Sequence, residues 1–232
     1  MLLKLEKVSK SFYNPDGTPF TVIDNLDLEI EEGSFNAITG VSGSGKSTLL
    51  YLMGALLFPD SGDIYLDGVK LNSLNDSKLS HIRNEEMGFI FQNYNLIDGL
   101  SVYDNIILPQ LIGDSKKVDF PFELCQRLGL EGKINTKVGL LSGGEKQRVA
   151  IIRAMVNSPK IIFADEPTGN LDKKNTQEVI ELLHLLTKEY KTSIVMVTHD
   201  LDSTQYCHKV YELKDGKAII KGEKSYDTGN SK

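Results

Sequence analysis

A glycine-rich segment between a short apolar run and a helical stretch constrains this chain more than any other feature. Residues 34–39 read Ser-Phe-Asn-Ala-Ile-Thr, and the following segment, Gly40 to Ser47, matches the pattern G-x-x-x-x-G-K-[ST]. Glycines let successive backbone N–H groups point inward around a polyphosphate, and a helix that begins at the end of the loop adds its positive dipole end. The segment therefore predicts a strand, a phosphate-binding loop and then a helix over residues 47–58, stopped by Pro59.

The side chains of this loop have separate predicted tasks. The ammonium group of Lys46 reaches the β- and γ-phosphates of a nucleotide, and the hydroxyl of Ser47 is a ligand of Mg²⁺. The phosphate-binding surface is predicted to comprise Gly40, Ser42, Gly43, Ser44, Gly45, Lys46, Ser47 and Thr48. The alternative is a surface glycine loop without function, and the strand and helix predicted on either side argue against it.

A pair of carboxylates follows a second apolar run. Residues 161–164 predict a buried strand, and Asp165 and Glu166 come directly after it. A nucleotide-bound Mg²⁺ needs a carboxylate, and hydrolysis needs a group that orients water. We expect Asp165 to hold Mg²⁺ through water and Glu166 to act as the general base beside the γ-phosphate. Taken alone, the pair could be a strand end with solvated acids, but the phosphate loop favours the catalytic interpretation.

The remaining pattern favours an α/β fold with a largely parallel sheet. Alternating apolar residues predict strands in the first thirty residues, and Asp67-Gly68 predicts a hairpin turn. Short apolar runs predict buried strands at residues 87–91 and 193–197. Helices are predicted at residues 76–86 and 172–189 and over much of 93–140. Helical segments between buried strands are typical of a parallel sheet, and the polar last dozen residues predict a frayed end.

Composition limits where such a chain can work. The 232 residues carry a net charge of −6, with 40% apolar and 25% charged residues, which is ordinary for a globular domain. The longest apolar run, residues 49–58, is about half of a membrane span, and the N-terminus does not resemble a secretory signal. Cys125 and Cys207 lack metal-ligand spacing and are predicted to be reduced thiols. We therefore expect a cytoplasmic protein, and the acidic charge disfavours nucleic acid as a partner.

A second glycine pair begins another predicted helix. Leu141-Ser142-Gly143-Gly144-Glu145 contains the capping-box spacing S-x-x-E, with Ser142 and Glu145 as the capping residues. A helix N-terminus after two glycines is a second anion-binding end. One chain would then have two phosphate-binding ends, which is too many for a single γ-phosphate. Two copies arranged head to tail would resolve this, each closing the nucleotide of the other.

These ordered motifs resemble the ATP-binding subunits of ABC transporters over nearly the whole chain. Residues 40–47 resemble the Walker A loop, residues 161–166 the Walker B strand with its catalytic glutamate, and residues 141–145 the signature that contacts ATP across a dimer. The usual fifth signature residue is Gln, and this chain has Glu145. The resemblance implies ATP as the nucleotide, with Ser142 and Gly144 as the γ-phosphate contacts.

The resemblance also implies a fold and its division. It is the P-loop NTPase (RecA-like) core with an N-terminal antiparallel β subdomain and an inserted α-helical subdomain. The whole chain, residues 1–232, is then a single ATPase domain. Residues 1–92 and 150–232 would form the β subdomain and the core, and residues 93–149 the helical subdomain with the signature.

Further roles follow from the same resemblance. Gln92 matches the Q-loop glutamine that senses Mg²⁺ and the membrane partner, and we count it among the metal ligands and catalytic residues. Asp172 matches the D-loop, and His199 matches the switch histidine that contacts the γ-phosphate. Phe12 aligns with the aromatic residue that stacks on adenine, and Tyr13 is the alternative. Either ring could instead pack within the strand layer.

Three segments, residues 91–96, 105–109 and 164–172, resemble a narrower group. It comprises the ATPases of macrolide export, lipoprotein release and antimicrobial-peptide resistance, in which ATP closes a homodimer that pulls on a separate membrane permease. The resemblance therefore implies a protein on the inner face of the cell membrane. Candidate contacts to the permease lie in residues 93–112, although some of them must be core: Tyr94, Leu96, Ile97, Tyr103, Ile106 and Ile107.

Two other functions remain open at this point. A cell-division-type ABC ATPase that regulates wall hydrolases through a membrane partner would carry the same motifs. A soluble DNA-repair or translation ABC protein is disfavoured, because the chain is acidic and holds one cassette without a long insertion.

Overall fold

The computed structural model describes residues 1–113 and 119–223. Its first sheet is antiparallel and has the strand order β2 (Pro19–Ile30), β1 (Leu3–Tyr13), β4 (Ser61–Leu66), β5 (Val69–Lys70). Leu3 pairs with Ile30 and Leu5 with Leu28, so the alternating apolar residues of both strands share one buried face. The predicted N-terminal strands and the hairpin at Asp67-Gly68 are confirmed.

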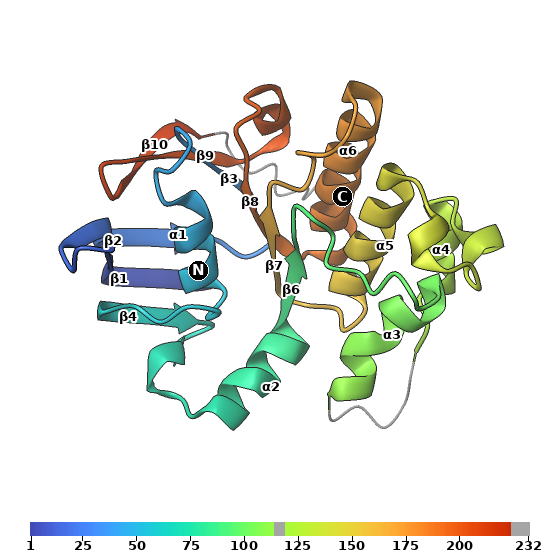
Figure 1. Ribbon diagram of the computed structural model, residues 1–232, viewed down its shortest axis with the longest axis horizontal. Helices are drawn as coiled ribbons and strands as arrows, with labels where there is room; N and C mark the ends of the chain where they lie inside the picture. The colour runs from blue at the N-terminus through green and yellow to red at the C-terminus, as the bar shows by residue number, and fades with distance from the viewer. Residues whose placement is uncertain (114–118, 224–232) are drawn as a thin grey trace, which may run out of the picture.

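The second sheet is the parallel one and lies at the centre of the molecule (Figure 1). Its order is β10 (Lys217–Glu223), β9 (Lys209–Lys214), β3 (Phe35–Thr39), β8 (Ser193–Val197), β7 (Ile161–Asp165), β6 (Met87–Ile90). All neighbours are parallel except β9 and β10. This confirms the largely parallel sheet, but the β9–β10 hairpin was not predicted from the sequence. Its signal is Asp215-Gly216, whose positive φ values of 49° and 74° suit a tight hairpin turn.

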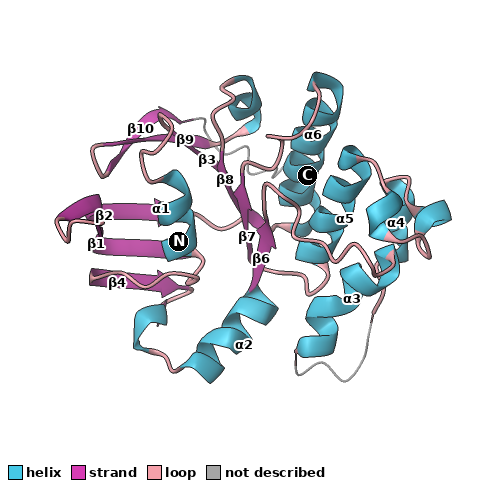
Figure 2. Ribbon diagram, in the orientation of Figure 1, coloured by secondary structure: helices cyan, strands magenta, loops and turns pink. Residues whose placement is uncertain are grey.

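Helices cover both faces of the parallel sheet (Figure 2). One face, with Phe163 and Val195, packs against α1 (Lys46–Met53) and the antiparallel sheet. The other face, with Ile162 and Ile194, packs against α5 (Gly143–Met155) and α6 (Lys173–Tyr190), and α3 (Val102–Ile112) packs on α5. Successive strand residues point to opposite faces, so these short apolar runs fill two separate cores. The helices α1 and α5 therefore lie on opposite faces of the sheet.

The remaining short elements connect these layers. The predicted helix at residues 76–86 is confirmed as α2 (Asp76–Glu86). The others are α4 (Phe122–Arg127) and the 3-10 turns η1 (Leu71–Ser73), η2 (Glu131–Lys133), η3 (Val138–Leu140) and η4 (Asp202–Tyr206). None of the helices in the described part of the chain is long and apolar enough to cross a membrane.

Two predicted helices differ from the structure. The prediction for residues 47–58 was wrong at its end, because α1 stops at Met53 and Ala55 adopts a left-handed φ of 50°. The helical prediction for 93–140 was too broad, because Tyr94 and Asn95 have φ values of 61° and 49° and only α3 and α4 are α-helical there. Residues 114–118 of that stretch lie outside the described residues. Left-handed residues end or exclude an α-helix, and sequence periodicity does not reveal them.

Two further predictions concern boundaries. The division of the chain at residues 93–149 and 150–232 stays a prediction, and the residue 149–150 boundary falls inside α5. Of the last dozen residues, 221–223 belong to β10, so they are not frayed as predicted, and 224–232 lie outside the described residues.

Candidate nucleotide-binding site

A cavity of about 610 Å³ opens where three neighbouring parallel strands end. The phosphate loop follows β3, Asp165 and Glu166 stand at the end of β7, and His199 follows β8. Carboxyl ends of parallel strands share one edge of a sheet, which is why these distant segments meet. The predicted residues on the cavity wall are Phe12, Ser42, Gly43, Gly45, Lys46, Ser47, Thr48, Glu166 and His199.

The loop conformation depends on its glycines. Gly40 and Gly45 have φ values of 148° and 95°, and a Cβ atom there would stand 2.6 Å from the Leu213 carbonyl oxygen and 2.4 Å from Val22. Larger residues would therefore push the loop off the neighbouring strands. Gly40 and Ser44 line an adjoining cavity of about 660 Å³. The Ser44 hydroxyl is buried and has no hydrogen-bond partner among the described residues.

Lys46 lies folded against its own loop. Its side chain is buried, and the ammonium group donates hydrogen bonds of 3.0 Å to the carbonyl oxygens of Gly40 and Val41. These acceptors carry only partial charge, whereas a phosphate oxygen would make a stronger, charge-assisted bond. The loop thus holds a buried cation and an unsatisfied hydroxyl beside the same backbone.

Asp165 is held on both carboxylate oxygens. The Ser47 hydroxyl donates to its Oδ1 at 2.9 Å and the Tyr51 hydroxyl donates to its Oδ2 at 2.8 Å. Burial, with the hydrogen bond to Asp165, raises the pKa of Tyr51 to about 12, so this phenol remains a donor. Tyr51 was not predicted from the sequence. It lies four residues after Ser47 and therefore on the same face of α1, and this spacing could have identified it.

Glu166 lies in a constrained turn beside His199. Its φ is 44°, and its backbone N–H donates to the Val197 carbonyl oxygen at 3.0 Å, which ties it to the end of β8. The Glu166 Oε1 and His199 Nδ1 atoms are 3.3 Å apart. A left-handed backbone at a non-glycine residue costs on the order of 1–3 kcal/mol and needs support from its surroundings. Here the neighbouring strand supplies that support.

Gln92 approaches the same turn from the end of β6. A Cβ atom added at Gly169 would be 3.1 Å from the Gln92 Nε2 atom and 3.4 Å from the Glu166 Oε2 atom. The side chain of Asn170 donates to the Gln92 carbonyl oxygen at 2.8 Å. Gln92 thus lies next to Glu166 through Gly169, although it is not on the cavity wall.

Aromatic rings close the other end of the cavity. Phe12 and Phe20 pair across β1 and β2, their ring centroids are 6.1 Å apart, and both line the cavity. Lys10 Nζ is 5.7 Å from the Phe12 ring centroid. The alternative residue, Tyr13, is 76% exposed and lies off the cavity wall. The sequence analysis missed Phe20, which could have been found as the partner of Phe12 across the turn near Asp16-Gly17.

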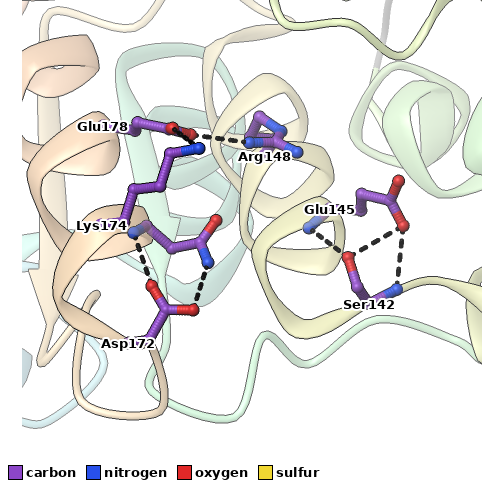
Figure 3. Close-up of polar contacts among 7 residues, drawn as sticks. Ser142, Glu145, Arg148, Asp172, Lys174 and Glu178 are labelled. Atoms are coloured by element: carbon purple, nitrogen blue, oxygen red, sulfur yellow. Dashed lines mark hydrogen bonds and ion pairs between the residues drawn. The ribbon is translucent and has the colours of Figure 1, made fainter.

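The second predicted phosphate-binding end lies elsewhere in the chain. Ser142 caps the N-terminus of α5, and its backbone N–H and hydroxyl each donate to Glu145 Oε2 at 2.9 Å, which confirms the capping box (Figure 3). Asp172 caps the N-terminus of α6, where its carboxylate accepts hydrogen bonds of 2.8 Å from the backbone and side chain of Asn175. Ser142, Gly144 and Asp172 are outside the wall of the cavity described above. One chain therefore does not bring its two predicted phosphate-binding ends into one pocket.

Known proteins share these features. Residues 23–169 match the family model described as ABC transporter. The chain is 44% identical over 221 residues to the macrolide export ATP-binding/permease protein MacB of Escherichia coli, covering 94% of this chain and 34% of that protein. It is also 44% identical over 203 residues to the lipoprotein-releasing system ATP-binding protein LolD of Aquifex aeolicus, covering 86% of this chain and 90% of LolD. The chain thus spans about a third of MacB and nearly all of LolD.

A solved structure agrees in fold. It is a dimeric post-hydrolysis state of the ATP-binding cassette MJ0796 bound to ADP and Pi, with a TM-score of 0.87, 36% identity and coverage of 97% of this chain and 100% of that one. The predicted P-loop architecture, with its antiparallel β part and helical parts, is confirmed by this match. The chain belongs to the ABC transporter family, as one of its ATP-binding cassettes.

Proposed function

We propose that this cassette hydrolyses ATP with Mg²⁺ in a head-to-tail homodimer and that hydrolysis drives a separate membrane permease. The main support for this proposal is that the phosphate loop, Asp165, Glu166 and His199 meet at the ends of three adjacent parallel strands. The names of MacB and LolD refer to macrolide export and lipoprotein release. They support antimicrobial compounds or lipoproteins as the cargo. Peptides as a further cargo, and a position at the inner face of the cell membrane, are proposed on the resemblance of the sequence.

The donor set at the loop fits Mg²⁺. Ser47 Oγ and Asp165 Oδ1 are hard oxygen donors 2.9 Å apart, and Mg²⁺ in nucleotide sites takes one or two such protein ligands together with substrate phosphates and water. We assign Ser47, Asp165 and the amide oxygen of Gln92 to the ion. When bound, Mg²⁺ would neutralise charge on the β- and γ-phosphates.

The phosphate loop would bind the polyphosphate through its backbone and Lys46. The backbone N–H groups of such a glycine-rich loop and the N-terminus of α1 would favour an anion. Lys46 would exchange its two carbonyl partners for phosphate oxygens, and the buried Ser44 hydroxyl would gain an acceptor. Phe12, with Phe20 behind it, would stack on the adenine.

Glu166 would act on the attacking water. Its carboxylate accepts the proton of the water that attacks the γ-phosphate in line, and its turn is fixed by the bond to Val197. The Nδ1 atom of His199 is 3.3 Å from Glu166 Oε1. His199 would also contact the γ-phosphate and so keep this phosphate beside Glu166. Catalysis of this kind comes mainly from positioning and charge neutralisation.

A second copy would complete each pocket. Ser142, Gly144 and Asp172 lie at the starts of α5 and α6, away from the loop of their own chain. In a head-to-tail dimer they would meet the γ-phosphate held by the partner copy. The dimeric form of the MJ0796 cassette supports this arrangement.

A groove of about 460 Å³ between α2, β6, α3 and α5 is the proposed permease site. Phe89, Phe91 and Ile112 line it, and Ile112 is 74% exposed. Ile106 and Ile107, which were predicted as candidate contacts, are buried in the core. None of the six predicted contact residues lines this groove: Tyr94, Leu96, Ile97, Tyr103, Ile106 and Ile107. Apolar grooves of this type suit the helix of a partner protein.

The hydrolytic role is tested by Glu166→Gln. We expect the rate of ATP hydrolysis to fall by at least about a hundredfold, because the water loses its base. ATP binding, measured by equilibrium dialysis, should stay within about threefold of wild type. A variant that still hydrolysed ATP near the wild-type rate would overturn the assignment of Glu166.

Co-purification from cells would identify the permease, and recovery of a partner with a hydrolase-binding loop would favour the cell-division alternative.

A further inference from the structure

The turn at the start of α5, residues 142–145, contains the carboxylate of Glu145, which contacts both Ser142 and Lys133. Glu145 occupies the first turn of α5, and its side chain is only 16% exposed. Its Oε2 atom accepts from the backbone and hydroxyl of Ser142, at 2.9 Å each (Figure 3). Its Oε1 atom contacts the ammonium group of Lys133. Each oxygen of Glu145 therefore has its own partner.

Lys133 reaches Glu145 from a fixed position. It is the last residue of η2, its backbone N–H donates to Leu130 at 2.9 Å, and its carbonyl oxygen accepts from Thr136 at 2.8 Å. Hydrogen bonding from Lys133, followed by that from Ser142, lowers the pKa of Glu145 to about 2. Glu145 is consequently charged at physiological pH.

The charge of Glu145 matters for the ligand expected at this helix end. The N-terminus of an α-helix carries the equivalent of roughly +0.5 charge, which attracts a phosphate. A full negative charge in the first turn outweighs that dipole, so the turn alone would repel a γ-phosphate. The ammonium group of Lys133 restores the balance.

We propose that Lys133 is a positioning residue of the dimeric ATP site, which neutralises Glu145 and holds its carboxylate when the partner's γ-phosphate takes over the hydrogen-bond donors of Ser142. The inference rests on the proposed function, because it requires a dimer in which Ser142 faces the nucleotide of the other copy. The competing interpretation is a purely structural ion pair that fastens η2 to α5. The two interpretations differ in what happens when Glu145 loses its charge.

The test uses the full chain with Glu166→Gln as the parent, and measures by sedimentation velocity the ATP concentration that gives half-maximal dimer. Lys133→Met should raise that concentration about tenfold, since an uncompensated carboxylate would repel the partner's γ-phosphate in the closed site. Glu145→Gln should not raise that concentration, because Lys133 then keeps a positive charge beside the phosphate, and the Lys133→Met/Glu145→Gln double variant should return to the level of the parent. Lys133→Arg should behave as the parent.

Controls separate charge from folding. Lys137→Met removes an exposed lysine four residues away and should leave dimerisation unchanged. ATP affinity of the dilute monomer should be equal in all variants, because Lys133 serves the partner's nucleotide. Lys133→Met should lower the thermal midpoint somewhat, because Lys133 lowers the pKa of Glu145, so dimerisation is measured well below that midpoint in every variant.

The outcomes distinguish this inference from the function on which it rests. If Glu145→Gln weakens dimerisation as much as Lys133→Met, or fails to rescue it, the ion pair is structural and the inference is overturned. The inference is also overturned if the parent dimerises with ATP and Lys133→Met dimerises equally well. In that case the proposed function still stands. If the parent itself does not dimerise with ATP, the proposed dimer is overturned and the inference with it.

Discussion

At the scale of single residues, the position of Asp165 depends on Tyr51, which belongs to none of the predicted motifs. Ser47 holds one oxygen of Asp165 and Tyr51 holds the other. Because Ser47 and Mg²⁺ would share the Oδ1 side, Tyr51 is the group that fixes how the carboxylate is turned. A hydrogen bond to a charged acceptor contributes about 1.5–3 kcal/mol.

We therefore expect Tyr51→Phe to raise the Mg²⁺ concentration needed for half-maximal ATPase activity by roughly tenfold. The free energy of unfolding should fall by about 1.5–3 kcal/mol, as urea denaturation would measure. Tyr65→Phe is the matched control, since its hydroxyl makes a longer contact of 3.4 Å with Asp63 in the antiparallel sheet. An unchanged Mg²⁺ requirement in Tyr51→Phe would show that Asp165 does not need this support.

Acid should weaken the start of α5 through Glu145. Lys133 and Ser142 lower the pKa of Glu145 from 4.5 to about 2, so folding favours the charged form. The stabilisation is complete above pH 4.5 and is lost as the pH falls toward 2. Glu145→Gln should therefore make the thermal midpoint less dependent on pH between 5 and 2 than in wild type. Parallel pH profiles of the two proteins would contradict this account.

At the scale of elements, α5 and α6 begin against each other (Figure 3). Arg148 of α5 and Glu178 of α6 form an ion pair of 3.3 Å. A Cβ at Gly144 would stand 2.7 Å from Asn175 Oδ1, and the Asn175 amide is itself held by Asp172 at 2.8 Å. The two helix starts that we assign to the partner's nucleotide are thus packed as one unit.

Gly144→Ala tests this packing. The added methyl group should displace Asn175 and cost its bond to Asp172, about 1 kcal/mol, which roughly offsets the helix propensity gained by alanine. The free energy of unfolding should therefore barely change. In an Asn175→Ala background, where the clash is absent, Gly144→Ala should stabilise the protein by about 1 kcal/mol. Equal effects of Gly144→Ala in both backgrounds, measured by urea denaturation, would show that the two residues are not coupled.

The sequence predicts elements well where local chemistry decides them. The strand, loop and helix around Gly40–Ser47, and the acids after β7, follow from spacing alone. The end of α1 and the residues around Tyr94 were mispredicted, because left-handed backbone there reflects tertiary packing. Tyr51, Phe20 and Lys133 were missed for a related reason: each acts through a contact to another segment, and no short motif records such contacts.

At the scale of the whole molecule, the places of the two proposed phosphate-binding ends explain why we expect one chain to be incomplete. The cavity at α1 and the capped turn of α5 belong to helices on opposite faces of one sheet. No rotation of a side chain can bring them to the same phosphate, so closure needs a second copy. Sequence analysis predicted this from the presence of two anion-binding ends, and the fold supplies the geometric reason.

Sedimentation of the Glu166→Gln protein with saturating ATP and Mg²⁺ tests this central claim most directly. We predict a species of twice the 25.8 kDa chain mass that returns to the single-chain mass when ATP is removed. A protein that binds ATP yet sediments as a single chain at every concentration would contradict the account.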